Sequence, residues 1–288
     1  MATVFLNGSF LSVDDAKLSA LDAGTQHAVG LFETMLGGNR DGAPWVVELD
    51  GHMDRLSASA AELGLSPDLR AGALAEAVVE TVRRSGLTRA RIRLTVTGGD
   101  LNMLAKPDAS GKPRAADPTI LIVTQPATNY PRTMLEGGVT ASVADSKANP
   151  FNPMEGHKTL NYWWRLRELQ LAGAKGAAEA LVFDITNHLV GGCVSNAMII
   201  SDDTIITPIA RGEEGFGEEG PSGELEERRA KGAYLPSAAL PGITRAWLLD
   251  RASIAGLRVR RRMITIQDIL AADELFLTNS SWGVLPIT

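Results

Sequence analysis

The stretch GHKTLNYWW, Gly156 to Trp164, places a lysine directly before a run of apolar and aromatic residues. Lysine carries a strongly hydrated cation and is rarely buried without a partner. Lys158 therefore has two interpretations. Its amine extends into water at the start of a helix, or it is buried in order to do chemistry. The rest of the sequence has to decide between them.

The composition describes a globular chain with an acidic balance. Of 288 residues, 44% are hydrophobic, and the formal net charge is −6. Nucleic-acid phosphates bind clustered cations, so we expect no nucleic-acid partner. The basic run RVRRRM, Arg258–Met263, lies in a strand-like segment. A solvated strand face is the favoured interpretation of that run, and an anion site is the alternative.

Cysteine usage and the N-terminus predict a cytoplasmic protein. The single cysteine, Cys193, excludes an internal disulfide and is typical of a reducing compartment. The start, MATVFLNGSFLS, has neither the basic region nor the apolar run of a signal peptide. No uncharged apolar stretch reaches the length of a membrane span.

The first part of the chain alternates between strand and helix patterns. TVFLNG and FLSVDDAKLSA predict a hairpin, and four strands are predicted at GLFETMLGG, APWVVELD, RIRLTVTGG and PTILIVTQ. DGHMDRLSASAAELG predicts a helix that stops at Gly64. A second helix is predicted with Ser66 as N-cap, Pro67 at the first helical position and Gly86 as its end. Residues 100–118 predict a flexible loop.

The second part repeats this mixture after QPATNYP, the best candidate for a linker. Strands are predicted at GGVTASVAD, EALVFD, LVGGCVSNAMIISDDTIITP and, as the last strand, ELFLTN. Helices are predicted from about Asn161 to Gly173 or Gly176, in PGITRAWLLDRASIAG, and in TIQDILAAD with Thr265 and Asp268 as its capping pair. The glutamate-rich segment 211–231 predicts an exposed loop. We expect two α+β domains, residues 1–125 and 132–288, joined by a linker at 126–131.

Several familiar catalytic motifs are missing from the sequence. The four histidines are scattered without metal-ligand spacing, so we expect no metal site. There is also no GxSxG elbow, P-loop or dinucleotide fingerprint. The glycine-rich runs GGNRDG and GEEGFGEEG lack the strand–turn–helix context that phosphate binding requires.

Three sites with weaker sequence signals could bind an anion. PGITR begins a helix, where the free backbone N–H groups near Ile243 and Thr244 would suit a phosphate or simply form an ordinary N-terminus. Ser280 and Ser281 follow a strand and could donate hydrogen bonds, although they are also common turn residues. Arg55 lies one helical turn after a histidine and is either solvated or a fixed cation.

Six segments occur in one order along almost the whole chain: GLFET, DGHMDRL, HKTLNY, EALVFD with GGCVSNAMII, LPGITR and ADELFLTNSSWGVLP. In this respect the chain resembles the class IV aminotransferases, the fold type IV enzymes that depend on pyridoxal 5′-phosphate. The group includes branched-chain and D-amino acid aminotransferases and 4-amino-4-deoxychorismate lyases. The resemblance implies an α+β fold in which a small α/β sandwich precedes a larger pseudo-barrel domain.

The resemblance also implies an answer for the lysine. Lys158 matches the residue that forms the internal aldimine with the cofactor and then moves the substrate Cα proton. The other cofactor-binding positions implied by the resemblance are Arg55, Ile243, Thr244, Ser280 and Ser281 at the phosphate and Leu240 against the ring.

Two departures from the family pattern stand out. Gly191 occupies the position of the glutamate that pairs with the pyridine nitrogen, so another acid, water or a less activated ring is implied. Near the N-terminus, Ala23 and the segment QHAVG leave the substrate contacts open.

The resemblance therefore implies a homodimeric enzyme that transfers an amino group between an amino acid and a 2-oxo acid. One alternative is a 4-amino-4-deoxychorismate lyase, which forms 4-aminobenzoate and pyruvate. The other is a protein that binds the cofactor with weak or no turnover, because Gly191 replaces the glutamate.

Overall fold

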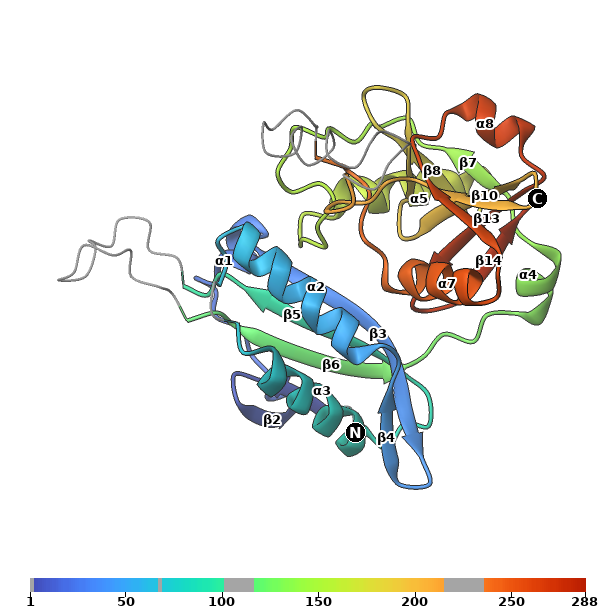
Figure 1. Ribbon diagram of the computed structural model, residues 1–288. Coiled ribbons are helices and arrows are strands. Elements are labelled where there is room, and N and C mark those ends of the chain that lie inside the picture. Colours follow the sequence, from blue (N-terminus) through green and yellow to red (C-terminus); the bar gives the residue numbers. More distant parts are fainter. Residues whose placement is uncertain (1–2, 67–68, 101–116, 215–235) are drawn as a thin grey trace. The chain divides into compact units, whose positions relative to one another are not determined.

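The computed structural model describes residues 3–66, 69–100, 117–214 and 236–288. It divides into two compact units (Figure 1). The first contains Met1–Thr128 and Lys158–Asn161, and the second contains Asn129–His157 and Tyr162–Thr288. Lys158 thus belongs to the first unit, which differs from its expected position in the C-terminal domain. Most of the predicted loop at 100–118 and most of the one at 211–231 lie outside the described residues.

The first unit is built on a six-stranded sheet with the order β2-β1-β6-β5-β3-β4. Each pair of neighbouring strands is antiparallel. The strands are β1 (Thr3–Leu6), β2 (Ser9–Ser12), β3 (Gly30–Arg40), β4 (Ala43–Val46), β5 (Ala90–Thr97) and β6 (Ile120–Pro126), and the helices are α1 (Ala23–His27), α2 (Leu49–Glu62) and α3 (Ala71–Ser85). The hairpin and strands predicted for this part of the sequence are confirmed, except that the strand predicted at 43–50 ends at Val46 and its last two residues begin α2.

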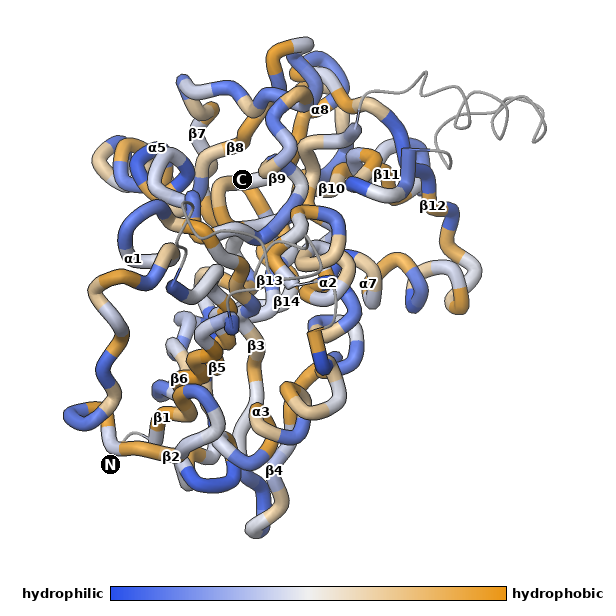
Figure 2. The backbone as a smooth tube through the Cα atoms, turned by 90° about the vertical axis from the view of Figure 1, so that its left-hand side faces the viewer, coloured by the Kyte–Doolittle hydropathy of each residue, from blue (hydrophilic) through white to orange (hydrophobic). Residues whose placement is uncertain are grey.

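One hydrophobic core joins α2 and α3 to this sheet. Leu56 and Val78 from the two helices are buried with Leu31, Ile92 and Ile122 from the strands. Figure 1 shows the two helices against the sheet, and Figure 2 shows hydrophobic residues running along β5 and β6. The core forms because strand alternation and helical spacing each direct one apolar face inward.

The start of α3 differs from the prediction, whereas its end does not. Ser66 is not the N-cap, because α3 begins five residues later with Arg70 as its N-cap, and the Ser66 N–H bonds to the carbonyl of Ala60 at the end of α2. The helix begins at Ala71 after Arg70, and Pro67 lies outside the described residues. Gly86 ends the helix with a φ of 65°, a conformation that glycine adopts without steric cost.

The second unit contains two sheets. One has five strands in the order β12-β11-β10-β13-β14, and the other has the order β7-β8-β9. The strands are β7 (Ala141–Val143), β8 (Glu179–Phe183), β9 (Leu189–Gly192), β10 (Asn196–Ser201), β11 (Thr204–Thr207), β12 (Arg258–Arg261), β13 (Glu274–Asn279) and β14 (Gly283–Ile287). The helices are α4 (Arg132–Gly137), α5 (Trp163–Ala174), α7 (Ile243–Ile254) and α8 (Ile266–Ala271).

The prediction that ELFLTN is the last strand is wrong. The chain turns at residues 280–282 and returns as β14, antiparallel to β13. Gly283 assists this turn with a φ of 80°. The strand-like reading of the basic run is confirmed by β12, and the predicted capping pair of Thr265 and Asp268 begins α8.

Helix α7 covers one face of the five-stranded sheet. Leu249 and Ala252 of the helix are buried together with Met198 of β10 and Phe276 of β13. Residues of these two strands that alternate with Met198 and Phe276 face the opposite core. The first turn of α7 lies against this covered face, where it meets Asn196, as described below. None of the helices within the described ranges has the length and hydrophobicity of a membrane span.

Candidate active site

Lys158 lies on a short extended segment that pairs with the edge of β3 in the first unit. The N–H of Phe32 donates to the carbonyl of Lys158 at 2.9 Å, and the N–H of Leu160 donates to the carbonyl of Gly30 at 2.9 Å. The amine Nζ of Lys158 lies 4.5 Å from the centroid of the Phe32 ring. The Arg93 guanidinium lies 3.8 Å from the same centroid. The lysine is half-buried beside an aromatic ring, so it does not simply extend into water.

A polar cluster lies on the other face of β3, under α2. Glu33 occupies a core position between Leu31 and Met35, and its side chain is 1% exposed. Arg55 donates from Nε to Glu33 Oε1 at 2.9 Å and from Nη2 to Oε2 at 2.5 Å. His52, one turn earlier on α2, bonds through Nδ1 to Glu33 Oε2 at 2.7 Å. The cluster therefore fixes the plane of the Arg55 guanidinium.

The charges in this cluster follow from its burial and contacts. Burial raises the pKa of Glu33, but the charge of Arg55 and hydrogen bonds from His52 and Arg55 outweigh it and lower that pKa to about 2. Burial lowers the pKa of His52, and its bond to Glu33 opposes the shift only in part. The positive charges of Arg55 and Lys158 lower the His52 pKa further. At neutral pH, His52 is therefore a neutral donor to an ionised Glu33.

The second unit contains an open helix N-terminus. Gly242 is the N-cap of α7, and no side chain among the described residues caps the first turn, which contains Ile243 and Thr244. Asn196 donates from Nδ2 to the carbonyl of Leu240 at 2.8 Å. A Cβ at Gly242 would lie 1.7 Å from Asn196 Oδ1, so only glycine fits there. Exposed backbone N–H groups at a helix start bind anions.

A buried hydroxyl lies on the same face of the sheet. Thr278 is directly opposite Asn196 in the pairing of β10 with β13, so both side chains project from one face. The Thr278 hydroxyl is buried and has no hydrogen-bond partner among the described residues. Ser280 and Ser281 follow in the turn after β13, where the N–H of Ser281 donates to Asn279 Oδ1 at 2.8 Å. This group of donors suits an anion.

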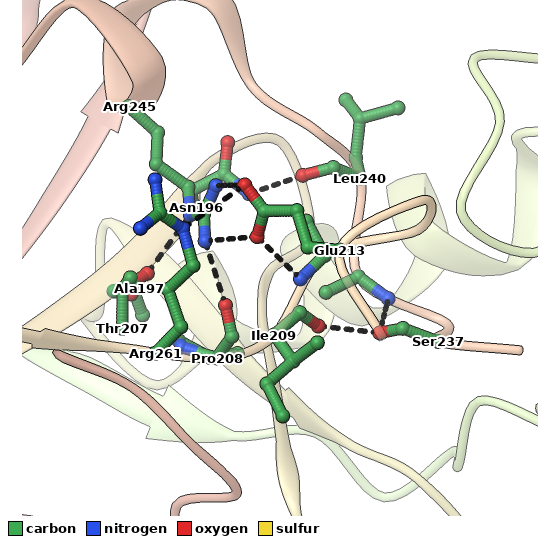
Figure 3. A network of polar contacts seen from close by, with 12 residues as sticks. Asn196, Ala197, Thr207, Pro208, Ile209, Glu213, Ser237, Leu240, Arg245 and Arg261 are labelled. Atoms are coloured by element: carbon green, nitrogen blue, oxygen red, sulfur yellow. Dashed lines mark hydrogen bonds and ion pairs between the residues drawn. The ribbon is translucent and has the colours of Figure 1, made fainter. Parts of the chain in front are cut away.

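An ion pair between a buried arginine and a half-buried glutamate holds the start of α7 in place (Figure 3). Arg245, 2% exposed, donates to both carboxylate oxygens of Glu213 at 2.9 and 2.7 Å. It also donates to Thr207 Oγ1 and to the carbonyl of Pro208, each at 2.9 Å. Burial raises the pKa of Glu213, but the hydrogen bonds and charge of Arg245 outweigh it and lower the pKa overall. Arg245 thereby connects α7 to the end of β11.

Gly191 has a backbone that does not suit a side chain. Its φ is 151°, and a Cβ would lie 2.8 Å from the carbonyl oxygen of Ser195. A glutamate at this position would therefore be strained as well as crowded.

The buried acid next to this position is Glu179, whose carboxyl carbon would lie 2.8 Å from a Cβ at Gly192. Burial raises its pKa, and four hydrogen bonds to its oxygens oppose that shift. The donors are the N–H groups of Ala180, Cys193 and Val194 and the hydroxyl of Ser195. Glu179 is thus committed to supporting the turn between β9 and β10.

The sequence-predicted residues fall into two sets. Arg55 and Lys158 lie in the first unit, whereas Leu240, Ile243, Thr244, Ser280 and Ser281 lie in the second. Ala23, the departure near the N-terminus, is 1% exposed and packs inside the first unit.

Sequence reasoning missed Glu33, His52, Asn196 and Thr278. The clearest available signal was Glu33, because alternation from Leu31 to Met35 places a carboxylate in the core of a strand.

Comparisons with known proteins agree over nearly the whole chain. The family model for amino-transferase class IV matches residues 30–215 and 229–288. A protein of Methanocaldococcus jannaschii with the provisional name branched-chain-amino-acid aminotransferase is 29% identical over 99% of this chain and 86% of its own. The branched-chain amino acid aminotransferase of Escherichia coli has the same fold, with a TM-score of 0.80, 23% identity and coverage of 99% and 85%. The 4-amino-4-deoxychorismate lyase of Pseudomonas aeruginosa gives a TM-score of 0.75, 26% identity and coverage of 99% and 90%.

Proposed function

The chain belongs to the class IV aminotransferase family of pyridoxal-phosphate-dependent enzymes, and from that premise we propose that it transfers an amino group between an amino acid and a 2-oxo acid. The observation that carries this proposal is Lys158, whose half-buried amine lies beside the Phe32 ring on a segment fixed to β3. A lysine held in this way suits an amine that reacts, because its backbone position is set by two hydrogen bonds.

The phosphate of the cofactor fits the donors of the second unit. The uncapped first turn of α7 offers the N–H groups of Ile243 and Thr244, and Ser280 adds a hydroxyl. The buried Thr278 hydroxyl, which has no partner within the described residues, is a further donor in this region. We propose that these residues bind the phosphate and that Leu240 packs against the ring. The family resemblance supports Arg55 as a further phosphate ligand. A dianion at such a site is stabilised by the helix dipole and by hydrogen bonds.

When bound, pyridoxal phosphate supplies an electron sink for the bond that breaks at the substrate Cα. The protein supplies the base and the orientation. Nζ of Lys158 would take the proton from the substrate Cα and deliver it to C4′ of the cofactor. The aromatic ring of Phe32 shields one side of this amine and limits the approach of water.

A lyase is the second candidate, and Gly191 is the observation that favours it. The backbone at Gly191 does not accommodate a carboxylate, and the oxygens of Glu179 are already engaged. A ring nitrogen without an acid withdraws electrons less strongly, so we expect slow transamination. Release of a leaving group competes better under that condition. The 26% identity to a solved 4-amino-4-deoxychorismate lyase supports this candidate.

The visible spectrum of the protein with added pyridoxal phosphate tests both candidates. We expect a Schiff-base band that disappears in Lys158→Ala. Bleaching of the band by particular L- or D-amino acids would identify an aminotransferase. A band that ignores every amino acid but changes with aminodeoxychorismate would identify the lyase, and a band that ignores both would leave only cofactor binding. The absence of any band in the wild type would refute the proposed function.

We further propose that the enzyme is a cytoplasmic homodimer that acts on small molecules. The family resemblance supports the dimer, and the single cysteine supports a reducing compartment. Light scattering coupled to size exclusion measures the mass directly. A monomer with full activity would contradict the proposed dimer.

A further inference from the structure

The guanidinium of Arg55 belongs to the hydrogen-bonded cluster of Glu33, His52 and Arg55. Glu33 receives two of its N–H groups in a parallel fork, at 2.9 and 2.5 Å. His52 bonds to the same carboxylate at 2.7 Å and leaves Glu33 little freedom to rotate. Every member of this cluster lies on regular secondary structure, Glu33 on β3 and the other two on α2.

We propose that Glu33, supported by His52, is a positioning residue that sets the direction in which Arg55 meets the cofactor phosphate. This inference rests on the proposed function, because it requires Arg55 to bind that phosphate. A guanidinium is planar, so a carboxylate that binds Nε and one Nη fixes the directions of all the other N–H bonds. The Arg55 side chain would otherwise have to lose considerable rotamer freedom when the phosphate binds.

The burial of the cluster supports a positioning role. The side chains of Glu33 and Arg55 are 1% and 9% exposed, so water does not compete strongly for their hydrogen bonds. The negative charge of Glu33 also offsets the positive charge of Arg55. A phosphate therefore gains little from the net charge of this pair. It gains from a donor edge that is already oriented.

Because of this charge balance, the direction in which one substitution changes the affinity for pyridoxal phosphate decides between two roles of Glu33. In Glu33→Gln the negative charge is lost, but the side chain keeps its size. If Glu33 only neutralised Arg55, the variant would attract the phosphate more strongly and bind pyridoxal phosphate more tightly. If Glu33 positions Arg55, the variant binds it more weakly, because the amide group replaces one acceptor oxygen with a donor.

The experiment compares the affinity of the full-length apoprotein for pyridoxal phosphate and for pyridoxal, which lacks the phosphate. We expect Glu33→Gln to weaken the binding of pyridoxal phosphate by about tenfold, as for the loss of one charge-assisted hydrogen bond. The affinity for pyridoxal should stay within about twofold of the wild-type value. In an Arg55→Met background the same substitution should have no further effect on pyridoxal phosphate, because the guanidinium that Glu33 positions is absent.

Glu80→Gln is the matched control. Glu80 also receives a two-pronged contact from an arginine, with Arg83 Nε and Nη2 at 2.7 and 2.6 Å, but this pair is exposed on α3. We expect this variant to bind both compounds as the wild type does. If Glu33→Gln fails to fold in a thermal melt, His52→Gln takes its place, with the same expected selectivity for the phosphate compound.

Three results would overturn the inference. They are tighter binding of pyridoxal phosphate, equal weakening of both compounds, and an undiminished effect in the Arg55→Met background. A wild type that binds neither compound would instead refute the proposed function on which the inference depends.

Discussion

Gly242→Ala isolates the close packing at the start of α7. The backbone of Gly242, with φ −71° and ψ 135°, suits alanine. In the absence of a clash, the substitution would stabilise the protein by about 0.4–1 kcal/mol, because alanine has less freedom in the unfolded chain. The new Cβ, however, would lie 1.7 Å from Asn196 Oδ1 and 2.8 Å from its Cγ.

The cost of this contact follows from what Asn196 would have to give up. Its backbone is held by the pairing of β10 with β13, where Asn196 lies opposite Thr278, so the side chain must rotate. Rotation breaks the 2.8 Å bond to the carbonyl of Leu240. Overpacking costs about 1–3 kcal/mol, and a buried polar group that loses its partner, here the amide of Asn196, costs about 1–3 kcal/mol. We expect Gly242→Ala to lower the free energy of unfolding by about 3 kcal/mol.

Urea denaturation monitored by tryptophan fluorescence measures this loss of unfolding free energy, since Trp247 lies on α7. The matched measurement repeats Gly242→Ala in an Asn196→Ala background, where the obstructing side chain is absent. There the substitution should be neutral or slightly stabilising. The reasoning fails if Gly242→Ala is harmless in the wild type, or if it costs the same in both backgrounds.

Three further substitutions have expected outcomes. Gly191→Glu should lower the free energy of unfolding of the apoprotein by about 1–3 kcal/mol, because of its φ of 151° and the crowding by Ser195; an unchanged denaturation midpoint would contradict this. The low pKa of Glu33 contributes stability that is complete above the ordinary value of 4.5 and is lost as pH falls toward about 2, so Glu33→Gln should flatten the fall in stability over that range; an equally steep acid titration in the variant would exclude Glu33 as its source. Thr278→Val should raise the stability of the apoprotein by about 1 kcal/mol, because the buried hydroxyl has no partner among the described residues, and should weaken pyridoxal phosphate binding; a destabilised valine variant would show that the hydroxyl is already bonded.

The features that the sequence predicted well depend on neighbouring residues. Gly86 ends α3, and Thr265 with Asp268 caps α8, because each signal acts within one helical turn. The same rule placed an N-cap at Ser66 and was wrong there, since the residue lies beside the end of α2 and α3 begins only at Ala71. A cap pattern does not reveal which of two neighbouring helices uses it.

The features that were missed depend on contacts between distant segments. The strand-like pairing of Lys158 with β3 requires a register that no local pattern encodes. The backbone of Gly191 is likewise set by Ser195 across a turn. The role proposed for Lys158 was available from the family resemblance, but its surroundings at Phe32 were not.

The placement of Lys158–Asn161 has a consequence for synthesis of the chain. The first unit is discontinuous in the sequence, because this segment follows a portion of the second unit. While the ribosome is still making that portion, β3 has an unsatisfied edge near Gly30 and Phe32. Exposed strand edges recruit other chains. Truncated products that end before the lysine should therefore aggregate, and a synthetic peptide covering the missing segment should suppress this, in the manner of a donated strand.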